Sequence, residues 1–194
     1  MSSNLLVEAY ALFDQANAKD PNQHNINGKL VPKELIYGQR MSQTIEKFEP
    51  NASEALKLAA RSQHICRWEI PRKDYPMDRI GYLKWREDLK KFHAAKASEI
   101  LEKVGYDSEI IDRVSFLLQK KKLKKDEDTQ TLEDVICLVF LNFYYEDFLN
   151  KHTPEKVIDI LQKTWRKMSE KGHKAALQLS YSEKALDLVK KALA

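Results

Sequence analysis

The sequence predicts an all-α fold, organised as a single helical bundle over residues 1–194 with a small N-terminal hairpin. Glycine and proline are scarce, with five and six occurrences among 194 residues. Charged residues make up 32% of the chain and hydrophobic residues 43%, a balance typical of helix-rich globular proteins. Apolar residues recur at helical spacing through most of the chain, and neither an internal repeat nor a linker divides it.

The N-terminal part begins with a predicted helix over residues 4–19, where apolar residues repeat every three or four positions from Leu5 to Ala16. The segment DPNQHNINGKLVP ends this helix. Its Asn27-Gly28 pair predicts a tight turn between two short strands. A second helix is expected after Pro32, running to Phe48.

The middle of the chain is predicted to hold two helices separated by a loop. Ser53 is expected to cap a third helix, EALKLAARSQHICRW, which would end at Trp68. The next segment, EIPRKDYPMDRIG, is expected to be a loop because its two prolines exclude a continuous helix. A long fourth helix is predicted over residues 82–104, with Gly105 as its C-cap.

The remaining helices are predicted from their caps and apolar patterns. A fifth helix opens at Asp107 or Ser108 and runs into the lysine cluster QKKKLKK. The sixth, LEDVICLVFLNFYYEDFL, is apolar on nearly all sides, which is typical of a helix surrounded by others. Thr153 and Pro154 provide the cap and first-turn proline of a seventh helix. Residues 153–194 form a C-terminal extension, in which the amphipathic segments KAALQL and SEKALDLVKKALA are expected to pack on the outside.

Composition argues against several classes of protein. No apolar run approaches the ~18 residues that a membrane span needs, and the first residues lack the basic and apolar blocks of a secretory signal. No membrane partner is therefore expected. Cys66 and Cys137 lie in apolar stretches, so we expect buried free thiols and a cytoplasmic location. A net charge of +4 is too small to indicate a dedicated DNA-coating protein.

Two histidines and two carboxylates are predicted to face the same interior. His64 continues the row of apolar residues at positions 56 and 60, and His93 lies on the apolar side of the fourth helix. Glu133 and Asp134 fall in the first turn of the sixth helix. Each also has a purely structural interpretation, since core histidines are often hydrogen-bonded and acids stabilise helix N-termini.

Arginines gather around His64 and predict a phosphate site, because guanidinium groups bind phosphate through paired hydrogen bonds. Lys121 in the lysine run is a further candidate. Alternatively, the arginines pair with nearby acids and only hold the loop together, and the lysine run is a solvated helix end. The candidate arginines are Arg40, Arg61, Arg67, Arg72 and Arg79.

Longer motifs resemble two known families. ALKLAARSQHICRW, FHAAKASEILEKVGYDSEIIDRVSFLLQKK and LEDVICLVF are similar to helices of the HD-domain superfamily, most of whose members are metal-dependent phosphohydrolases, over residues 35–148. YGQRMS, RWEIPR, YPMDRIGYLKWR, LEDVICLVFLNFY and KTWRKMS resemble a small bacterial and fungal family classed as a domain of unknown function. The first resemblance implies an HD-like bundle, and the second implies no established activity.

The HD resemblance implies a divalent metal site in which two of the usual ligands are replaced. Tyr37 falls near the position of the first histidine, and Ile65 replaces the aspartate of the His-Asp doublet. His64, Asp134 and, from a further superfamily position, His93 are then the expected metal ligands. Because tight sites usually use three protein ligands plus water, a metal-free site is an equal alternative.

Together these features predict a protein that binds a phosphorylated small molecule, with a nucleotide as the leading candidate and metal-assisted hydrolysis as a further expectation. In such a mechanism His64 and Asp134 hold the ion or orient water, and Glu133 is the alternative carboxylate. His93 or Glu69 acts as general acid-base. Arg61, Arg67 and Lys121 neutralise the phosphate.

Two other functions are consistent with the same sequence. A non-catalytic binding or adaptor protein could contact RNA through Lys120–Lys125 and nearby arginines, with salt-sensitive affinity. A purely structural partner protein would present a large exposed apolar patch.

Overall fold

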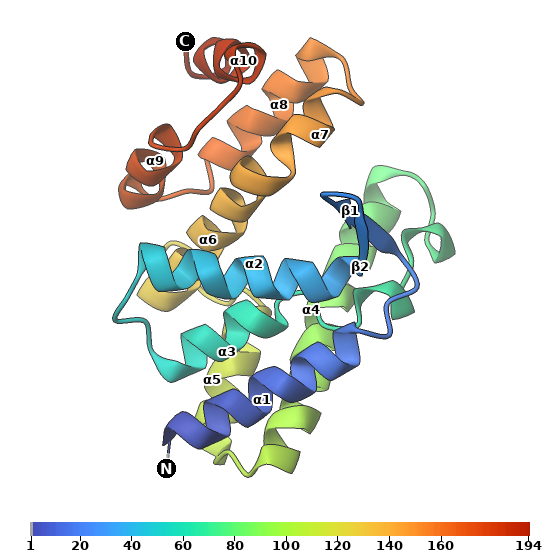
Figure 1. The fold of residues 1–194 in the computed structure, drawn as a ribbon, viewed down its shortest axis with the longest axis vertical. Helices are drawn as coiled ribbons and strands as arrows, with labels where there is room; N and C mark the ends of the chain where they lie inside the picture. Colours follow the sequence, from blue (N-terminus) through green and yellow to red (C-terminus); the bar gives the residue numbers. More distant parts are fainter. Residues whose placement is uncertain (1) are drawn as a thin grey trace.

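The computed structural model describes residues 2–194 and confirms an all-α fold with a small hairpin (Figure 1). The elements in chain order are α1 Ser2–Asn17, β1 Gln23–Ile26, β2 Lys29–Pro32, α2 Lys33–Phe48, α3 Glu54–Ser62, α4 Arg79–Val104, α5 Ser108–Leu118, α6 Glu127–Phe143, α7 Tyr145–Leu149, α8 Pro154–Trp165, α9 Glu170–Leu177 and α10 Glu183–Leu193. Two short 3₁₀ helices, η1 Arg67–Glu69 and η2 Arg72–Asp74, lie in the connection between α3 and α4.

The hairpin turns where the sequence predicts it. β1 and β2 pair antiparallel, with Gln23 opposite Pro32 and Ile26 opposite Lys29. Asn27 and Gly28 occupy the turn with φ angles of 51° and 85°, the left-handed values that a two-residue hairpin turn needs. The Asn25 side chain accepts a hydrogen bond from the Gly28 N–H at 2.8 Å.

Side-chain caps fix where most helices begin. Ser53, Asp107 and Thr153 cap α3, α5 and α8 as expected. α4 begins earlier than predicted, because the Asp78 carboxylate accepts a hydrogen bond from Gly81 N at 2.7 Å and so caps a helix starting at Arg79.

The third helix is shorter than predicted, and the correction matters for the site. α3 ends at Ser62, whereas the sequence pattern extends it to Trp68. The chain then makes tight turns, and Cys66 adopts a left-handed φ of 51° that no right-handed helix can include. The Asn17 side chain stabilises this turn by accepting a hydrogen bond from Cys66 N at 2.9 Å.

α6 lies at the centre of the molecule, as its apolar composition predicts. The predicted sixth helix is divided at Tyr144, where a φ of −127° separates α6 from α7. The N-terminal cluster, formed by buried side chains of α1 to α6, includes Phe13, Met41 and Leu101. The C-terminal cluster, formed by α6 to α10, includes Tyr145. α9 and α10 lie in Figure 1 at the end of the molecule farthest from α1, and they supply buried residues to this second cluster instead of only covering the first.

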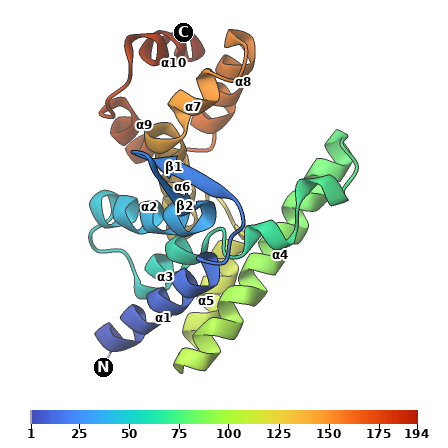
Figure 2. The same ribbon diagram turned by 45° about the vertical axis from the view of Figure 1, so that its right-hand side comes forward.

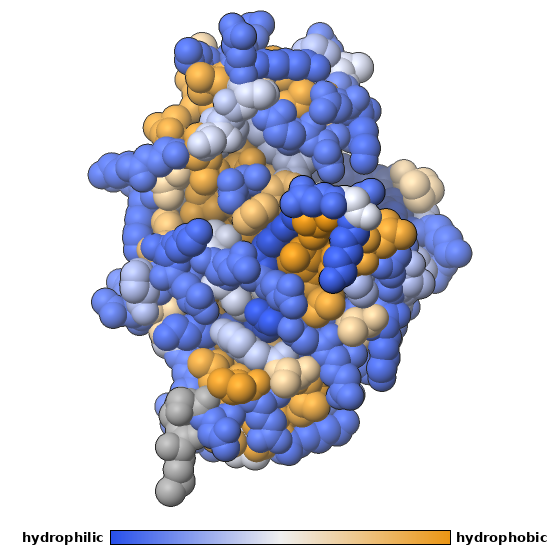
Figure 3. Space-filling view, viewed as in Figure 1, coloured by the Kyte–Doolittle hydropathy of each residue, from blue (hydrophilic) through white to orange (hydrophobic). Residues whose placement is uncertain are grey.

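The N-terminal half of α4 stands away from the rest of the molecule (Figure 2). Its first turns carry Ile80 and Leu83, and Met77 lies just before its N-cap; these three residues are 78%, 56% and 79% exposed. On the face drawn in Figure 3, hydrophilic side chains predominate and hydrophobic ones gather in a few patches. Within residues 2–194, no helix is long and apolar enough to cross a bilayer.

Candidate functional site

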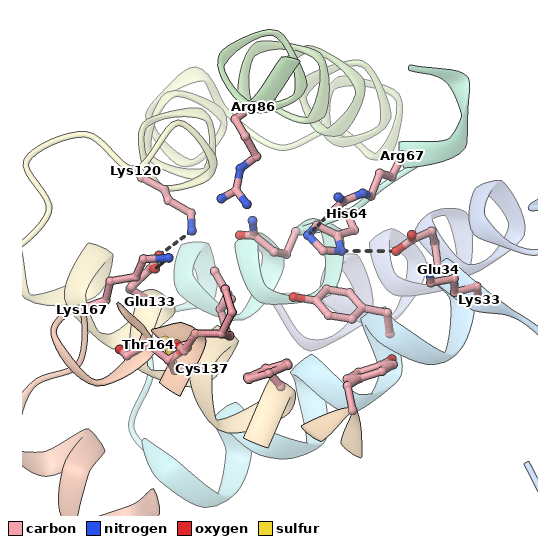
Figure 4. A pocket seen from close by; sticks show the side chains of 16 residues that line it. Lys33, Glu34, His64, Arg67, Arg86, Lys120, Glu133, Cys137, Thr164 and Lys167 are labelled. Atoms are coloured by element: carbon pink, nitrogen blue, oxygen red, sulfur yellow. Dashed lines mark hydrogen bonds and ion pairs between the residues drawn. The ribbon is translucent and has the colours of Figure 1, made fainter. Parts of the chain in front are cut away.

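A cavity of about 400 Å³ lies between α2, α4, α6 and α8, next to the turns that follow α3 and α5 (Figure 4). Its wall includes residues of both hydrophobic clusters, such as Tyr37 of the N-terminal cluster and Cys137 of the C-terminal cluster. Three of the predicted catalytic and phosphate-binding residues line it, namely His64, Arg67 and Glu133. The cavity is therefore the candidate functional site.

His64 is held between a carboxylate and a guanidinium. Its Nδ1 lies 3.3 Å from Oε2 of Glu34, and its Nε2 lies 2.9 Å from Nη1 of Arg67. Because a guanidinium only donates hydrogen bonds, Nε2 accepts, and the ring proton lies on Nδ1, facing Glu34. The imidazole also stacks on the ring of Tyr37, with 4.1 Å between the ring centroids.

The surroundings keep His64 neutral. Burial lowers the pKa of its imidazole well below the ordinary value, and the positive charges of Arg67 and Arg86 lower it further. Burial also raises the pKa of the Glu34 carboxyl, against the opposing effect of Arg67. With both ring nitrogens engaged, His64 connects Arg67 to Glu34 and is not a free base.

A second charged group forms where the turn after α5 meets the start of α6. The Glu133 carboxylate, on a residue only 3% exposed, accepts a hydrogen bond from Lys120 Nζ, and its other oxygen lies 3.7 Å from Lys167 Nζ. Burial opposes the charged carboxylate, yet the two ammonium groups outweigh it and hold the pKa of Glu133 below its ordinary value. Burial lowers the pKa of Lys120, and Glu133 counteracts part of that shift.

Backbone geometry explains why Lys120 faces inward. Lys120 follows α5 with a left-handed φ of 55°, which turns the chain sharply at that residue. Its side chain is 13% exposed, whereas the neighbouring Lys121 is on the surface and does not line the cavity. The lysine run therefore divides into one buried residue and an exposed remainder.

Arg86 reaches the cavity from α4 and lies between the two charged groups (Figure 4). Its Nη1 is 3.4 Å from the hydroxyl of Tyr82, and within the described part of the chain no carboxylate forms an ion pair with it. The cavity lining holds two carboxylates, Glu34 and Glu133, against five cationic side chains, so with His64 neutral its formal charge is +3. The cationic side chains are Lys33, Arg67, Arg86, Lys120 and Lys167.

The rest of the lining is mostly apolar and aromatic, and comes from α2, α6, the residue after α6, and α8. Tyr37 and Tyr144 both belong to it, and their ring centroids lie 6.1 Å apart. A cavity that combines unpaired positive charge with aromatic rings suits an anionic ligand that also carries a flat or apolar part. These lining residues are Tyr37, Ile136, Cys137, Phe140, Tyr144 and Ile160.

Two of the predicted phosphate-binding arginines have protein partners elsewhere. Arg61, near the end of α3, forms a two-pronged ion pair with Asp14 of α1, with N···O distances of 2.8 and 2.6 Å. Arg72 donates hydrogen bonds to the carbonyl oxygens of Tyr75 and Asp78. Both agree with the alternative interpretation, in which arginines hold neighbouring segments together.

The other candidates outside the cavity differ in their surroundings. Arg40 lies behind the cavity wall, with its guanidinium 4.6 Å from the ring centroid of Phe143 and 5.0 Å from that of Tyr144. Arg79 and Glu69 are exposed and do not line the cavity. Glu69 is in η1, which leads away from the turn that carries His64.

The structure does not bring the three expected metal ligands together. The Asp134 carboxylate is directed towards α9, where it accepts hydrogen bonds from the Ser169 N–H at 2.8 Å and from the Ser169 hydroxyl at 2.5 Å. The ring of His93 lies 5.8 Å from that of His64, and its Nδ1 donates to the carbonyl oxygen of Ile65. Over residues 2–194, no group of three or more His, Cys, Asp and Glu side chains is arranged to hold a metal ion. The residues present therefore do not fit the implied metal site.

The charged cavity residues that were not predicted from the sequence include Glu34, Arg86 and Lys167. Each lies in a segment with a simpler explanation: Glu34 in the first turn of α2, Arg86 on a charged stretch of α4, and Lys167 after the end of α8. Charged residues at such positions are usually solvated or balance the helix dipole. Only the three-dimensional arrangement of α2, α4 and the end of α8 around the cavity reveals that they meet.

Comparison with known proteins places the chain in a family. A family model described as Domain of unknown function (DUF4202) matches residues 7–189. The chain belongs to this family. No curated protein and no solved structure matches it. Membership in DUF4202 agrees with the second resemblance seen in the sequence, and the resemblance to HD-domain phosphohydrolases stays a prediction.

Proposed function

We propose that this member of the DUF4202 family binds a phosphorylated small molecule in the cavity, and that a nucleotide is the class of ligand that suits the lining best. The observation that carries the proposal is the charge of the cavity, which includes the guanidinium of Arg86, not ion-paired with any carboxylate of the described residues, and the buried ammonium of Lys120. A site with a formal charge of +3 attracts a multiply charged anion.

The arrangement of charges suggests where the phosphate lies. Arg86 is open to the cavity, and Lys120 and Lys167 share the single carboxylate of Glu133 between them. A phosphate group next to Arg86 would gain charge-assisted hydrogen bonds from a guanidinium fork and from the two ammonium groups. The aromatic wall with Phe140 and Tyr144 is then left for a base or another flat group.

Binding is favoured over hydrolysis by the state of the groups expected to do chemistry. His64 has both ring nitrogens engaged, and the Asp134 carboxylate is committed to Ser169. His93 is 4% exposed, and burial lowers its pKa to about 3. None of the three offers a free base next to the proposed phosphate position.

A small ligand is also favoured over RNA. Lys120 is turned into the cavity, and Lys124 Nζ donates to the carbonyl oxygen of Arg166 at 3.0 Å. These two lysines are therefore removed from the run that RNA binding would need, and an electrostatic RNA site depends on several accessible cations. The two cysteines are free and buried, which supports a reducing compartment such as the cytoplasm.

Isothermal titration of the purified protein with adenosine 5′-monophosphate, adenosine and inorganic phosphate is the direct test. We expect the monophosphate to bind and adenosine to bind far more weakly. Arg86→Met should weaken monophosphate binding about tenfold to a hundredfold, the value of a hydrogen bond to a charged group. Arg79→Met is the matched control, because Arg79 is exposed on the same helix.

Two outcomes would contradict the proposal. Equal binding of adenosine and its monophosphate would show that the cationic lining does not recognise phosphate. An equal loss of affinity in Arg79→Met and Arg86→Met would show that any binding depends on net charge instead of on the cavity. Release of phosphate, followed in the same samples, would add hydrolysis to the proposed binding function.

A further inference from the structure

Glu34 is a carboxylate in a cavity whose charge attracts anions. It is 6% exposed, and its Oε2 lies 3.3 Å from Nδ1 of His64. Within the described residues no protein group donates to the other oxygen, Oε1, and that atom is not among the buried polar atoms without a partner. Since Glu34 lines the cavity, an acceptor oxygen remains available there.

The protein holds this carboxylate in one orientation. Nδ1 of His64 faces its Oε2 at 3.3 Å, Arg67 donates a hydrogen bond to Nε2 of the same ring, and Tyr37 fixes the plane of the imidazole by stacking on it. These contacts restrict the orientation of the Glu34 carboxylate, so the direction of its acceptor oxygens is well defined. A fixed acceptor in a binding site is most useful for recognising a ligand group that donates hydrogen bonds.

Figure 4 separates the two ends of the cavity. Lys120, Lys167 and Glu133 lie at one end, His64 and Glu34 lie at the other, and Arg86 lies between them. A phosphate next to Arg86 and the two lysines would leave the Glu34 end for a different part of the same ligand. That part cannot be another anion, because the Glu34 carboxylate would repel it.

We propose that Glu34 selects ligands whose phosphate is accompanied by uncharged hydroxyl donors, such as the vicinal diol of a ribonucleotide or a sugar phosphate. This inference rests on the function proposed above. Hydroxyls are favoured over an amine because a cavity with a formal charge of +3 disfavours a further cation. A carboxylate oxygen with free lone pairs accepts from a hydroxyl without any change in charge.

The test compares adenosine 5′-monophosphate with its 2′,3′-dideoxy analogue by isothermal titration of the unmodified protein. We expect the diol-bearing ligand to bind about tenfold more tightly, as for one hydrogen bond to a charged acceptor. Ribose 5-phosphate, which has the hydroxyls without the base, should bind more tightly than inorganic phosphate. These measurements need no variant and cannot be affected by misfolding.

Glu34→Gln then assigns the preference to the carboxylate. It should lose most of the preference for the diol, while the dideoxy ligand binds as well or better, because a negative charge near the phosphate has been removed. A general loss of structure would weaken both ligands together. Glu46→Gln, an exposed position on α2, is the control and should behave as the unmodified protein.

The outcomes separate this inference from the proposed function. If both nucleotides bind equally well to the unmodified protein, or if Glu34→Gln retains the full preference, Glu34 does not select the diol and the inference is overturned. If neither nucleotide nor inorganic phosphate binds, the proposed function itself fails.

Discussion

Replacing Glu133 with glutamine is expected to lower the free energy of unfolding by about 3 kcal/mol, because it leaves the Lys120 ammonium buried without a counterion. The side chains of Glu133 and Lys120 are 3% and 13% exposed, so water cannot fully replace the lost carboxylate. Breaking a buried pair in this way usually costs about 3–5 kcal/mol, and the partial exposure of Lys120 places this pair near the lower end.

The reverse substitution should have a smaller effect. In Lys120→Met, the Glu133 carboxylate keeps the Lys167 ammonium 3.7 Å from its other oxygen, and that lysine, with a side chain 50% exposed, can move closer. We expect a loss of about 1–2 kcal/mol from the remaining desolvation of the carboxylate. In the double variant both charges are absent, so its loss should fall short of the sum of the single losses by about 2 kcal/mol.

Urea unfolding at pH 7, followed by far-ultraviolet circular dichroism, measures all three variants. The control pair is Asp159 and Lys163 on α8, with 42% and 54% of their side chains exposed, where Asp159→Asn should change stability by less than about 0.5 kcal/mol. If Glu133→Gln is as stable as the control, or if the Lys120 and Glu133 effects simply add, the pair does not stabilise the fold as argued.

Three further predictions concern separate features. Lys120→Gly should be about 1 kcal/mol more stable than Lys120→Ala, because glycine adopts the left-handed φ of 55° without strain; equal urea midpoints would contradict this. Asp134→Ala removes both bonds to Ser169 and should make the amides of α9 exchange with solvent faster than those of α10, as hydrogen exchange would show. His93 has a folded-state pKa of about 3, below the ordinary value near 6.5, so the unfolded chain takes up its proton first and stability falls as the pH drops below 6.5. The loss should reach about 2 kcal/mol at pH 5, and His93→Gln should reduce that slope in urea titrations at several pH values.

Most of the fold follows from local signals in the sequence. Thr153 and Pro154 place the start of α8, and the apolar composition of α6 predicts its central position, because both depend on interactions within a few residues. The predicted start of α4, at residue 82, lies three residues after the observed start at Arg79. The reason is also local, since Asp78 caps the helix although it lies in a segment bounded by prolines.

The site was predicted less completely because helix periodicity was extended past the end of α3. Arg61 and Arg67 are three residues before and after His64, so a continuous helix would place both near it. In the structure, Arg61 remains on α3 and pairs with Asp14, while the left-handed turn at Cys66 accompanies the change of direction that brings Arg67 to His64. Glu34 and Arg86 reach the cavity through tertiary packing, which no spacing rule in the sequence encodes.

Two features next to the cavity lower the stability of the folded state. Cys66 and Lys120, neither of them glycine, hold left-handed backbone conformations in the turns that carry Arg67 and the buried ammonium, and each such residue costs about 1–2 kcal/mol. The walls also keep Glu133 and Lys120 charged away from water, where apolar side chains would be as stable or more so. A fold selected for stability alone would place glycine at these turns and apolar residues in this wall. Lys122 and Lys124 share the left-handed conformation without lining the cavity, but the buried ion pair lies in its wall, and buried charge in a cavity is the pattern expected of a binding site.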